Sequence, residues 1–311
     1  MSDTALPQRQ VTGLNYFHHL VTGRLKPGRL WLERNYRIKY FFRSIAYPRT
    51  TCKMMSALAS EPLMQQILPI QHTLPSKIHR PYLYCGMPRI VRAQAIIDHY
   101  QFIKQLALPR MQTAMLTKQG IDLASFSGKN EESFVINLAC TGRCEREGEV
   151  NLSISCNGTA LAIITFAIMF QQGEKAIIIG GLQGAHRDTP HEAIREATKA
   201  CHGLFPKRLL IETLMLFAAA TCISKIQAVS DKGHIFRSLR YRLKKRRLFH
   251  AQYDEFWESL NAQRISSQLY QLPVTLPRKS LEDIASKKRA EARRRYELLD
   301  NLAASFRAQF S

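Results

Sequence analysis

The chain has 311 residues, and its 45 Lys and Arg against 24 Asp and Glu give a formal charge of +21. This length allows a sizeable core, and such a charge favours contact with polyanions. Seven scattered cysteines without a Cys-x-x-Cys pair argue against a disulfide framework and a zinc site. The first residues lack the apolar run of a secretory signal, and no stretch has the pattern of a transmembrane helix. We therefore expect a cytoplasmic protein without metal.

The N-terminal region, residues 1–118, is predicted to be helical and interrupted by prolines. Apolar residues recur at three- and four-residue spacing from Leu30 to Ala46, with basic residues between them, which predicts an amphipathic helix. Five prolines between residues 59 and 88 prevent continuous regular structure in that stretch. A second helix is expected from Arg89 to Leu108. This region is a candidate for a separate lobe.

The core, residues 119–260, is predicted to begin with an antiparallel meander. Asn157-Gly158 is typical of a tight hairpin, because both central residues of that turn need positive φ. The last two strands are almost entirely apolar, which predicts a central place in the sheet. The four predicted strands are residues 134–139, 149–155, 159–170 and 175–181.

Helices follow the meander. They are expected from Pro190 to Ala200 and from Pro206 to Thr221, with proline at each first turn, before a short strand at residues 225–230. The basic C-terminal region, residues 261–311, is predicted to form one long helix that starts near Ser280. The fold class is therefore α+β, a meander sheet with flanking helices.

The order of meander strands, loop, apolar helix and returning strand resembles the core of the Gcn5-related acyltransferases. In such enzymes a loop and a helix N-terminus hold the pyrophosphate of coenzyme A. Gly203, Lys207 and Arg208 are the candidate phosphate loop, since glycine permits close approach and the two cations add charge. The usual Gly-x-Gly/Ala pattern is missing, and the same residues also fit an ordinary boundary between two helices.

Titratable residues cluster after the glycine-rich segment 180–184. A histidine beside carboxylates can act as a general base, so the candidate catalytic residues are His186, Asp188 and His191. The alternative is a polar loop that caps the next helix. A second candidate group follows the last short strand and consists of Asp231, Lys232 and His234.

A basic cluster with interleaved aromatic residues follows this second group. Its cations can contact phosphates while its aromatic rings stack or insert. Because the cluster comes directly after the last core strand, we expect it to border the same cleft. The candidate polyanion-binding residues are Arg237, Arg240, Arg242, Lys244, Lys245, Arg246 and Arg247.

Five segments carry a resemblance to a known family. They are Gly181-Leu-Gln-Gly-Ala, His202-Gly-Leu-Phe-Pro-Lys-Arg-Leu, Ile226-Gln-Ala-Val-Ser-Asp, Tyr253-Asp-Glu-Phe-Trp-Glu and the basic segment that starts at Pro277. Together they resemble the VirK/YbjX family of Gram-negative bacteria over about residues 85 to 300. The resemblance implies a link to virulence, to the cell envelope and to survival against cationic antimicrobial peptides. It assigns no catalytic residue.

Two functional classes remain open. The first is an enzyme that transfers an acyl or aminoacyl group, with acyl-coenzyme A or aminoacyl-tRNA as the phosphorylated donor. The second is a non-enzymatic basic protein that binds RNA or anionic lipid, peripherally at the inner membrane. Charge does not separate them, because an enzyme with a phosphorylated donor also needs a basic surface.

Overall fold

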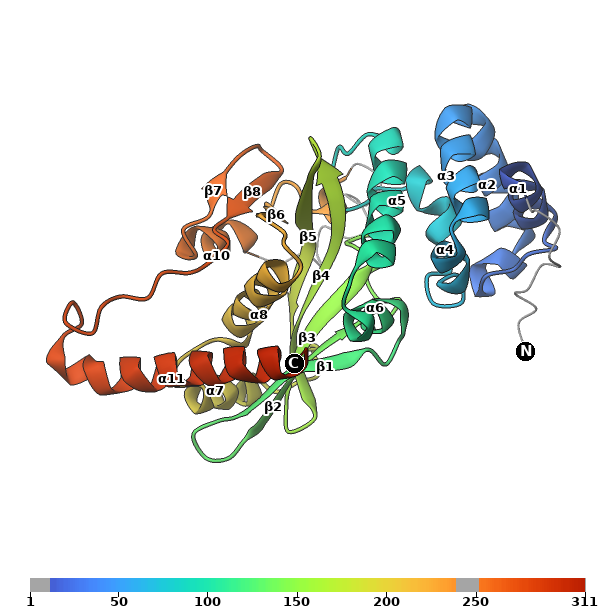
Figure 1. Ribbon diagram of the computed structural model, residues 1–311. Helices are drawn as coiled ribbons and strands as arrows, with labels where there is room; N and C mark the ends of the chain where they lie inside the picture. The colour runs from blue at the N-terminus through green and yellow to red at the C-terminus, as the bar shows by residue number, and fades with distance from the viewer. Residues whose placement is uncertain (1–11, 239–251, 311) are drawn as a thin grey trace.

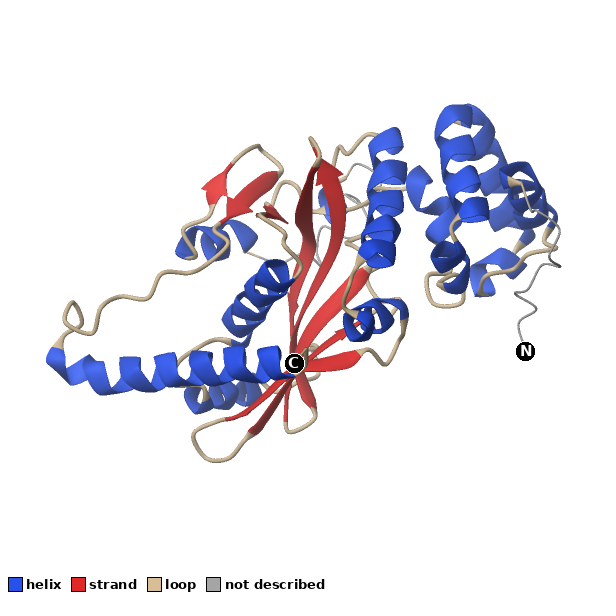
Figure 2. Ribbon diagram, in the orientation of Figure 1, coloured by secondary structure: helices blue, strands red, loops and turns tan. Residues whose placement is uncertain are grey.

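The computed structural model describes residues 12–238 and 252–310, and these residues form a mixed eight-stranded sheet with helices on both faces (Figures 1 and 2). The strand order is β1-β2-β3-β4-β5-β6-β8-β7. This confirms the α+β class. The strands are β1 (Ile121–Ser127), β2 (Ser133–Ala139), β3 (Val150–Cys156), β4 (Thr159–Gln171), β5 (Glu174–Gly184), β6 (Lys225–Val229), β7 (Gln263–Arg264) and β8 (Leu269–Leu272).

Strands β2 to β5 form the predicted antiparallel meander, and β1 adds a fifth antiparallel strand to it. Asn157 and Gly158 adopt φ values of 46° and 79° in the β3–β4 hairpin, as a tight turn of this kind requires. β1 was not predicted, because its polar residues and a register shift between Asp122 and Ala124 interrupt the alternation. β6 pairs with β5 in parallel and with β8 antiparallel, so the complete sheet is mixed.

Helices cover both faces of the sheet. α5 (Arg89–Gln105) and α6 (Pro109–Leu116) lie on one face, and α8 (Pro206–Ala220) and α11 (Ser286–Ala308) lie on the other, with α7 (His191–Ala200) against α8 (Figure 1). α11 begins later than predicted, because Ser280 caps an isolated turn in which its Oγ accepts the Glu282 N–H at 3.3 Å.

The N-terminal helices form a lobe, residues 12–79, that packs on α5 through α3 and η2 (Figure 1). The helix expected from Leu30 to Ala46 is two elements, η1 and α2, and the buried Trp31 in η1 donates its indole N–H to the His72 carbonyl at 2.6 Å. No described helix combines the length and the apolar character needed to cross a membrane. The elements of this helical lobe are α1 (Gly13–Thr22), η1 (Arg29–Leu32), α2 (Arg34–Ala46), α3 (Pro48–Ser60), α4 (Pro62–Gln66) and η2 (Leu74–His79).

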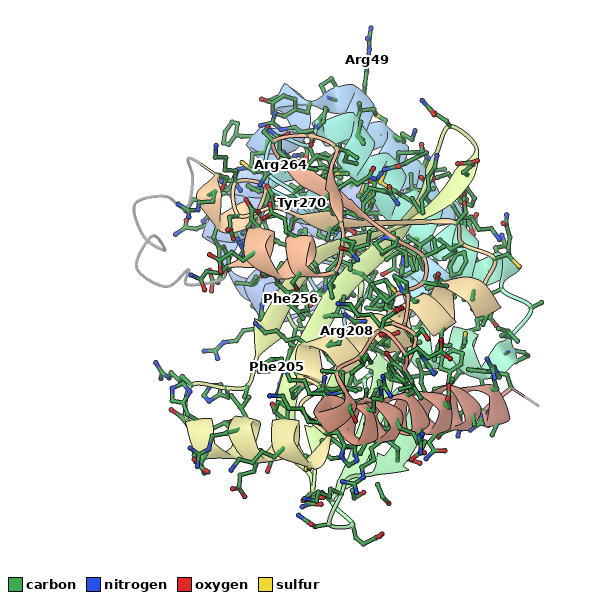
Figure 3. The ribbon with its side chains drawn as sticks, turned by 90° about the vertical axis from the view of Figure 1, so that its left-hand side faces the viewer. Arg49, Phe205, Arg208, Phe256, Arg264 and Tyr270 are labelled. Carbon is green, nitrogen blue, oxygen red and sulfur yellow. The ribbon has the colours of Figure 1, made fainter. Side chains whose placement is uncertain are left out.

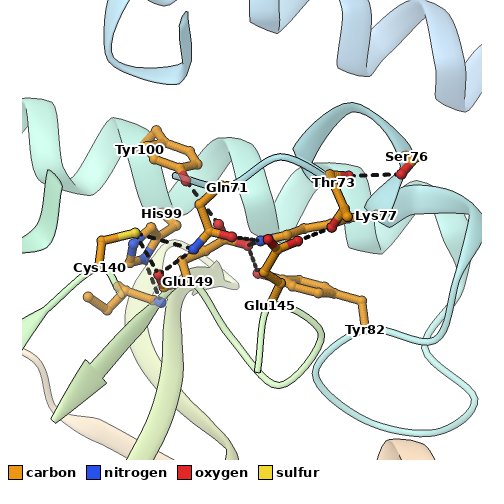
Figure 4. Close-up of polar contacts among 11 residues, drawn as sticks. Gln71, Thr73, Ser76, Lys77, Tyr82, His99, Tyr100, Cys140, Glu145 and Glu149 are labelled. Carbon is orange, nitrogen blue, oxygen red and sulfur yellow. Dashed lines mark hydrogen bonds and ion pairs between the residues drawn. The ribbon is translucent and has the colours of Figure 1, made fainter. Parts of the chain in front are cut away.

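A buried ion pair joins the helical lobe to the sheet (Figure 4). Lys77 Nζ of η2 lies 2.7 Å from Glu149 Oε1, just before β3, and neither side chain is more than 1% exposed. The phenols of Tyr82 and Tyr100 donate to the same carboxylate at 2.7 and 2.9 Å, and Lys77 also donates to Gln71 Oε1 at 2.8 Å. Burial, followed by the Glu149 charge, raises the pKa of both tyrosines well above its usual value, which keeps them as donors. Buried charges are tolerated where they are paired and hydrogen-bonded in this way.

Removing the cation from this pair is expected to destabilise the whole fold. Lys77→Met leaves the Glu149 carboxylate buried without its counter-charge and should lower the free energy of unfolding by about 3–5 kcal/mol, as measured by urea denaturation. The matched control is Lys104→Met, because Lys104 pairs with Glu61 at 3.1 Å while remaining 57% exposed. That variant should lose at most about 1 kcal/mol. Equal losses in the two variants would contradict this account.

Candidate functional site

A cavity of about 970 Å³ opens where the parallel strands β5 and β6 separate. The two strands pair from Ala176 and Lys225 to Ile179 and Ala228, after which β5 continues to Gly184 paired with β4 but not with β6. Side chains from the helical lobe, from the loop at residues 140–149 and from the segment after β6 line the opening, which we call the strand-end cavity. Its volume suits a ligand, and the carboxyl ends of parallel strands are common binding places.

The loop at residues 140–149 lies directly on β5 because glycines make room for it. A Cβ atom on Gly180 would overlap the backbone oxygen of Glu147, and one on Gly181 would overlap the Glu147 carboxylate. Gly148 is equally close to the backbone of Phe166 on β4. Glycine in a strand often marks a place where a loop or another backbone approaches closely. The structure identifies that loop and shows that it carries Glu147 into the strand-end cavity.

Glu147 is a buried carboxylate held by two side chains. Its Oε1 lies 3.4 Å from His234 Nε2, and its Oε2 accepts the Gln183 amide at 2.9 Å. Only 2% of the Glu147 and His234 side chains is exposed. Nδ1 of His234 accepts the backbone N–H of Phe236 at 3.4 Å, which places the proton of the neutral ring on Nε2, facing Glu147. The carboxylate is therefore oriented and available for proton transfer.

Two more groups beside Glu147 stay protonated. Gln183 Nε2 lies 3.1 Å from Cys144 Sγ, and burial, followed by the Glu147 charge, raises the pKa of the Cys144 thiol to about 11. The Tyr253 hydroxyl accepts the Leu182 N–H at 3.2 Å. Burial raises the pKa of Tyr253 above its usual value, and the Glu147 charge adds to this shift. Neither Cys144 nor Tyr253 can therefore take up a proton at neutral pH.

Cations dominate the rest of the lining. Arg80, Arg146, Arg187 and Lys207 all line the strand-end cavity, and Glu145 adds one further carboxylate. Burial lowers the pKa of Lys207, which is half-buried at the start of α8. A cation-rich cavity with one buried carboxylate favours an anionic ligand and a proton-transfer step. Among residues 12–238 and 252–310, no three His, Cys, Asp or Glu side chains are grouped to hold a metal ion.

The candidate catalytic residues after β5 lie outside this lining. His186 Nδ1 is 3.1 Å from Asp188 Oδ2, but the two side chains are 71% and 76% exposed. His191 is also exposed, at the first residue of α7. Arg187, which lies between His186 and Asp188 in the sequence, does line the strand-end cavity. A catalytic role for His186, Asp188 and His191 stays a prediction.

The candidate phosphate loop is divided between three environments. Lys207 lines the strand-end cavity, whereas Gly203 lines a separate groove between α7 and α11. Arg208 lies at the start of α8 (Figure 3), where its Nη2 pairs with Glu212 at 2.9 Å. The structure thus places only Lys207 beside Glu147, and a joint phosphate site of the three residues stays a prediction.

The basic cluster lies mostly outside the described residues. Arg237 is exposed, at the end of the short 3₁₀ helix η3 (Ile235–Arg237), and both Ile235 and Phe236 line the strand-end cavity. The first cation of the cluster therefore follows the cavity wall directly, and its role in polyanion binding stays a prediction. Its other members, Arg240, Arg242, Lys244, Lys245, Arg246 and Arg247, fall within residues 239–251, which are not described.

Sequence reasoning named His234 only within its second group and passed over Glu147. Glu147 stands in a run of alternating Glu and Arg or Gly residues, a pattern typical of a solvated loop. The adjacent glycines Gly180 and Gly181, which make room for Glu147 in the structure, were the one available signal in the sequence. The other members of the second group differ from His234. Asp231 accepts the Tyr253 backbone N–H at 2.8 Å and so positions α10 (Tyr253–Ser259), while Lys232 is exposed.

The reactivity of Cys144 tests its protonation state. With a pKa of about 11, about one thiol in a thousand is ionised at pH 8, against about one in four for an unperturbed cysteine. We expect iodoacetamide to modify Cys144 about a hundredfold more slowly than the exposed Cys52, as followed by peptide mass spectrometry. Glu147→Gln should accelerate Cys144, because it removes a neighbouring negative charge, and should leave the buried Cys140 unchanged. Modification of Cys144 as fast as Cys52 would refute this assignment.

Comparison with known proteins gives relatives along the whole chain. A family described as "Protein of unknown function (DUF535)" matches residues 29–308. The chain is 39% identical to the Escherichia coli K12 protein "Uncharacterized protein YbjX" over 308 residues, which cover 99% of this chain and 93% of that protein. Two uncharacterized proteins of Haemophilus influenzae are also similar. One is 37% identical over 41% of this chain and 42% of its own length, and the other is 29% identical over 64% of each. The chain therefore belongs to the DUF535 family, which is the VirK/YbjX family that its sequence segments resemble.

Proposed function

We propose that the protein is a transferase that moves an acyl or aminoacyl group from a phosphorylated carrier to an amine or hydroxyl acceptor in the strand-end cavity. The observation that carries this proposal is the buried Glu147 carboxylate, oriented by His234 and Gln183 inside a cation-lined cavity. The apolar helix α8 and the returning strand β6, which pairs with β5 in parallel, add support, since both belong to the order of an acyltransferase-like core, although α7 stands between β5 and α8 and departs from that order.

Glu147 acts as the general base in this scheme. It takes a proton from the acceptor amine or hydroxyl as the acceptor nitrogen or oxygen bonds to the donor carbonyl carbon. The carbonyl carbon then releases the carrier, either by breaking a C–S bond to a coenzyme A thiol or a C–O bond to a tRNA ribose. The leaving group takes up the proton. A positioned base of this kind contributes about 10²–10⁴-fold to the rate.

The cationic lining would hold the carrier. The diphosphate of coenzyme A and the backbone of tRNA both present phosphate oxygens, which guanidinium groups bind with paired hydrogen bonds. Arg80 and Arg187 can supply such groups, and Lys207 adds a half-buried charge beside Gly184, where its Cε lies within 3.9 Å of an added Cβ. In this proposal the phosphates lie near the cavity wall, and the reacting end of the donor lies at Glu147.

The neutral Cys144 favours direct transfer. A cysteine nucleophile needs its thiolate form, and burial with the nearby Glu147 charge raises the pKa of Cys144 to about 11. A covalent acyl-cysteine intermediate would have to overcome this protonation. We therefore propose that donor and acceptor occupy the strand-end cavity together.

In the cell, we propose that this transfer supports envelope integrity and resistance to cationic antimicrobial peptides, the roles that the family resemblance implies. A new acyl or aminoacyl group on an anionic envelope component changes the charge or the packing that a cationic peptide meets. The acceptor in this proposal is therefore an envelope lipid or its precursor.

Titration calorimetry with acetyl-coenzyme A, palmitoyl-coenzyme A and aminoacyl-tRNA tests the donor. We expect either the coenzyme A thioesters or aminoacyl-tRNA to bind. Lys207→Gln should weaken that binding by about fivefold or more, because one phosphate contact is lost. Arg278→Gln is the matched control, since Arg278 is paired with Asp300 and does not line the strand-end cavity. Failure of all three carriers to bind would overturn the transferase proposal.

A peptide-resistance assay in a strain that lacks the gene tests the base. Glu147→Gln keeps the size of the side chain and should abolish complementation while leaving carrier binding intact. Glu192→Gln, at an exposed carboxylate that pairs with Arg195, should complement fully. The opposite result would be complementation by Glu147→Gln and failure of a triple variant with alanine at His186, Asp188 and His191. It would assign the catalytic residues to the segment after β5.

A second candidate is polyanion binding without chemistry. The groove between α7 and α11, about 480 Å³ in volume, favours it, because Lys129, Lys199, Lys287 and Arg294 line it, with Glu291 as the acidic member. Such spacing of cations suits the RNA backbone or lipid phosphates. Loss of resistance on charge reversal at Lys287 and Arg294, or at residues 242–247, with no effect of Glu147→Gln, would favour this candidate.

A further inference from the structure

Helix α2 is apolar on two sides, and the fold buries only one of them. Tyr40 and Ser44 point inward, where the Tyr40 ring contacts Trp31 with centroids 5.0 Å apart. On the opposite side, Ile38 and Phe42 remain 40% and 64% exposed. The inward side packs α2 on the helical lobe, and the outward side leaves a large part of its apolar surface exposed.

Three of the outward apolar residues share one face of α2, and a fourth lies just before the helix. Ile38, Phe42 and Ile45 follow one another at four- and three-residue spacing and therefore share a helix face. Leu32 is tied to the start of α2, because Arg37 Nη1 donates to its carbonyl at 2.9 Å. Leu32 and Ile45 are 60% and 56% exposed. We define Leu32, Ile38, Phe42 and Ile45 as the α2 face.

The α2 face borders a hollow of about 490 Å³ between α1 and α2. Val21, Phe41 and Phe42 contribute apolar atoms to it, and Arg34 and Arg37 contribute charged groups. Residues 12–60 carry nine Lys or Arg and a single acidic residue, Glu33. The exposed cations of this stretch are Arg24, Lys26, Arg29, Arg34, Lys39 and Arg49.

We propose that the α2 face is a docking surface for an anionic phospholipid bilayer. Apolar side chains that enter the headgroup boundary, surrounded by cations that pair with lipid phosphates, are the two elements of interfacial membrane binding. A second copy of this chain does not fit, because two such strongly cationic lobes would repel each other. The excess of cations over acidic groups instead calls for a negatively charged partner surface.

The position of η1 connects this surface to the strand-end cavity. Leu30 of η1 lines that cavity, and Leu32, two residues later, belongs to the α2 face. Docking through the α2 face therefore brings one wall of the cavity to the membrane. The proposal does not depend on transfer chemistry, since the α2 face would bind lipid even if the cavity catalysed nothing.

Tryptophan fluorescence provides a local test with a matched control. The two native tryptophans, Trp31 and Trp257, are fully buried, so a new exposed tryptophan reports its own environment. Phe42→Trp and Phe205→Trp replace phenylalanines that are 64% and 63% exposed. Phe205 precedes α8, which packs on the sheet and not on the helical lobe (Figure 3). With phosphatidylcholine–phosphatidylglycerol vesicles, we expect a blue shift of the Phe42→Trp emission and none for Phe205→Trp.

Vesicle co-sedimentation of the full chain measures affinity. Phe42→Ser should weaken binding to phosphatidylglycerol-containing vesicles by about tenfold or more, because the apolar ring is lost, whereas Phe205→Ser should bind like the wild type. Arg34→Gln with Lys39→Gln should weaken binding by about fivefold per charge at low ionic strength. The matched charge control is Lys288→Gln with Arg293→Gln on α11, which should have no such effect.

Each alternative result overturns the proposal in a distinct way. Failure of the wild type to bind phosphatidylglycerol vesicles at low ionic strength excludes membrane docking. If Phe42→Ser and Phe205→Ser weaken vesicle binding equally, or if only the α11 charge variant weakens it, the membrane contact belongs to another surface. Equal binding to pure phosphatidylcholine excludes the anionic lipid. Loss of donor binding by calorimetry leaves the docking result untouched, which separates this proposal from the proposed transfer.

Discussion

The buried charge of Glu149 is the constraint on which the rest of the structure depends. A carboxylate without solvent must keep its counter-charge and its donors, and here they come from separate parts of the chain: Lys77 from η2 and Tyr100 from α5. The requirement therefore holds the helical lobe, α5 and the start of β3 in one arrangement. Glu147 stands two residues earlier in the same loop, so the anchor that satisfies Glu149 also sets how deeply Glu147 enters the strand-end cavity.

The glycines of β5 meet the opposite requirement, which is the absence of side chains. Gly180 and Gly181 face the loop so closely that a methyl group on either would displace Glu147. The same strand pairs with β6 only up to Ile179, and the cavity opens beyond this point. One strand thus provides both the space for the carboxylate and the edge of the cavity, and this explains how Glu147 is buried beside the apolar central strands.

The positive charge of the chain serves more than one surface. Part of it lines the strand-end cavity, where Arg187 and Lys207 line the same space as Glu147. Part of it lies between α7 and α11, and part surrounds the α2 face on the helical lobe. Net charge alone cannot separate an enzyme with a phosphorylated donor from a lipid-binding protein, since one chain can carry both kinds of surface. The placement of each cation relative to apolar or catalytic groups makes the distinction.

The sequence by itself determined the features that depend on neighbouring residues. Asn157-Gly158 encodes its hairpin through backbone preference, Pro206 marks the start of α8, and apolar runs identify β4 and β5 as central strands. The Glu147–His234 pair was decided only by the tertiary structure. Neither residue carries a local signal, because a polar loop residue looks the same in sequence whether it meets water or a buried imidazole. They meet because the loop that carries Glu147 lies on β5, beside the segment that follows β6. Local preferences act over a few residues, whereas a site depends on which distant surfaces are buried against each other.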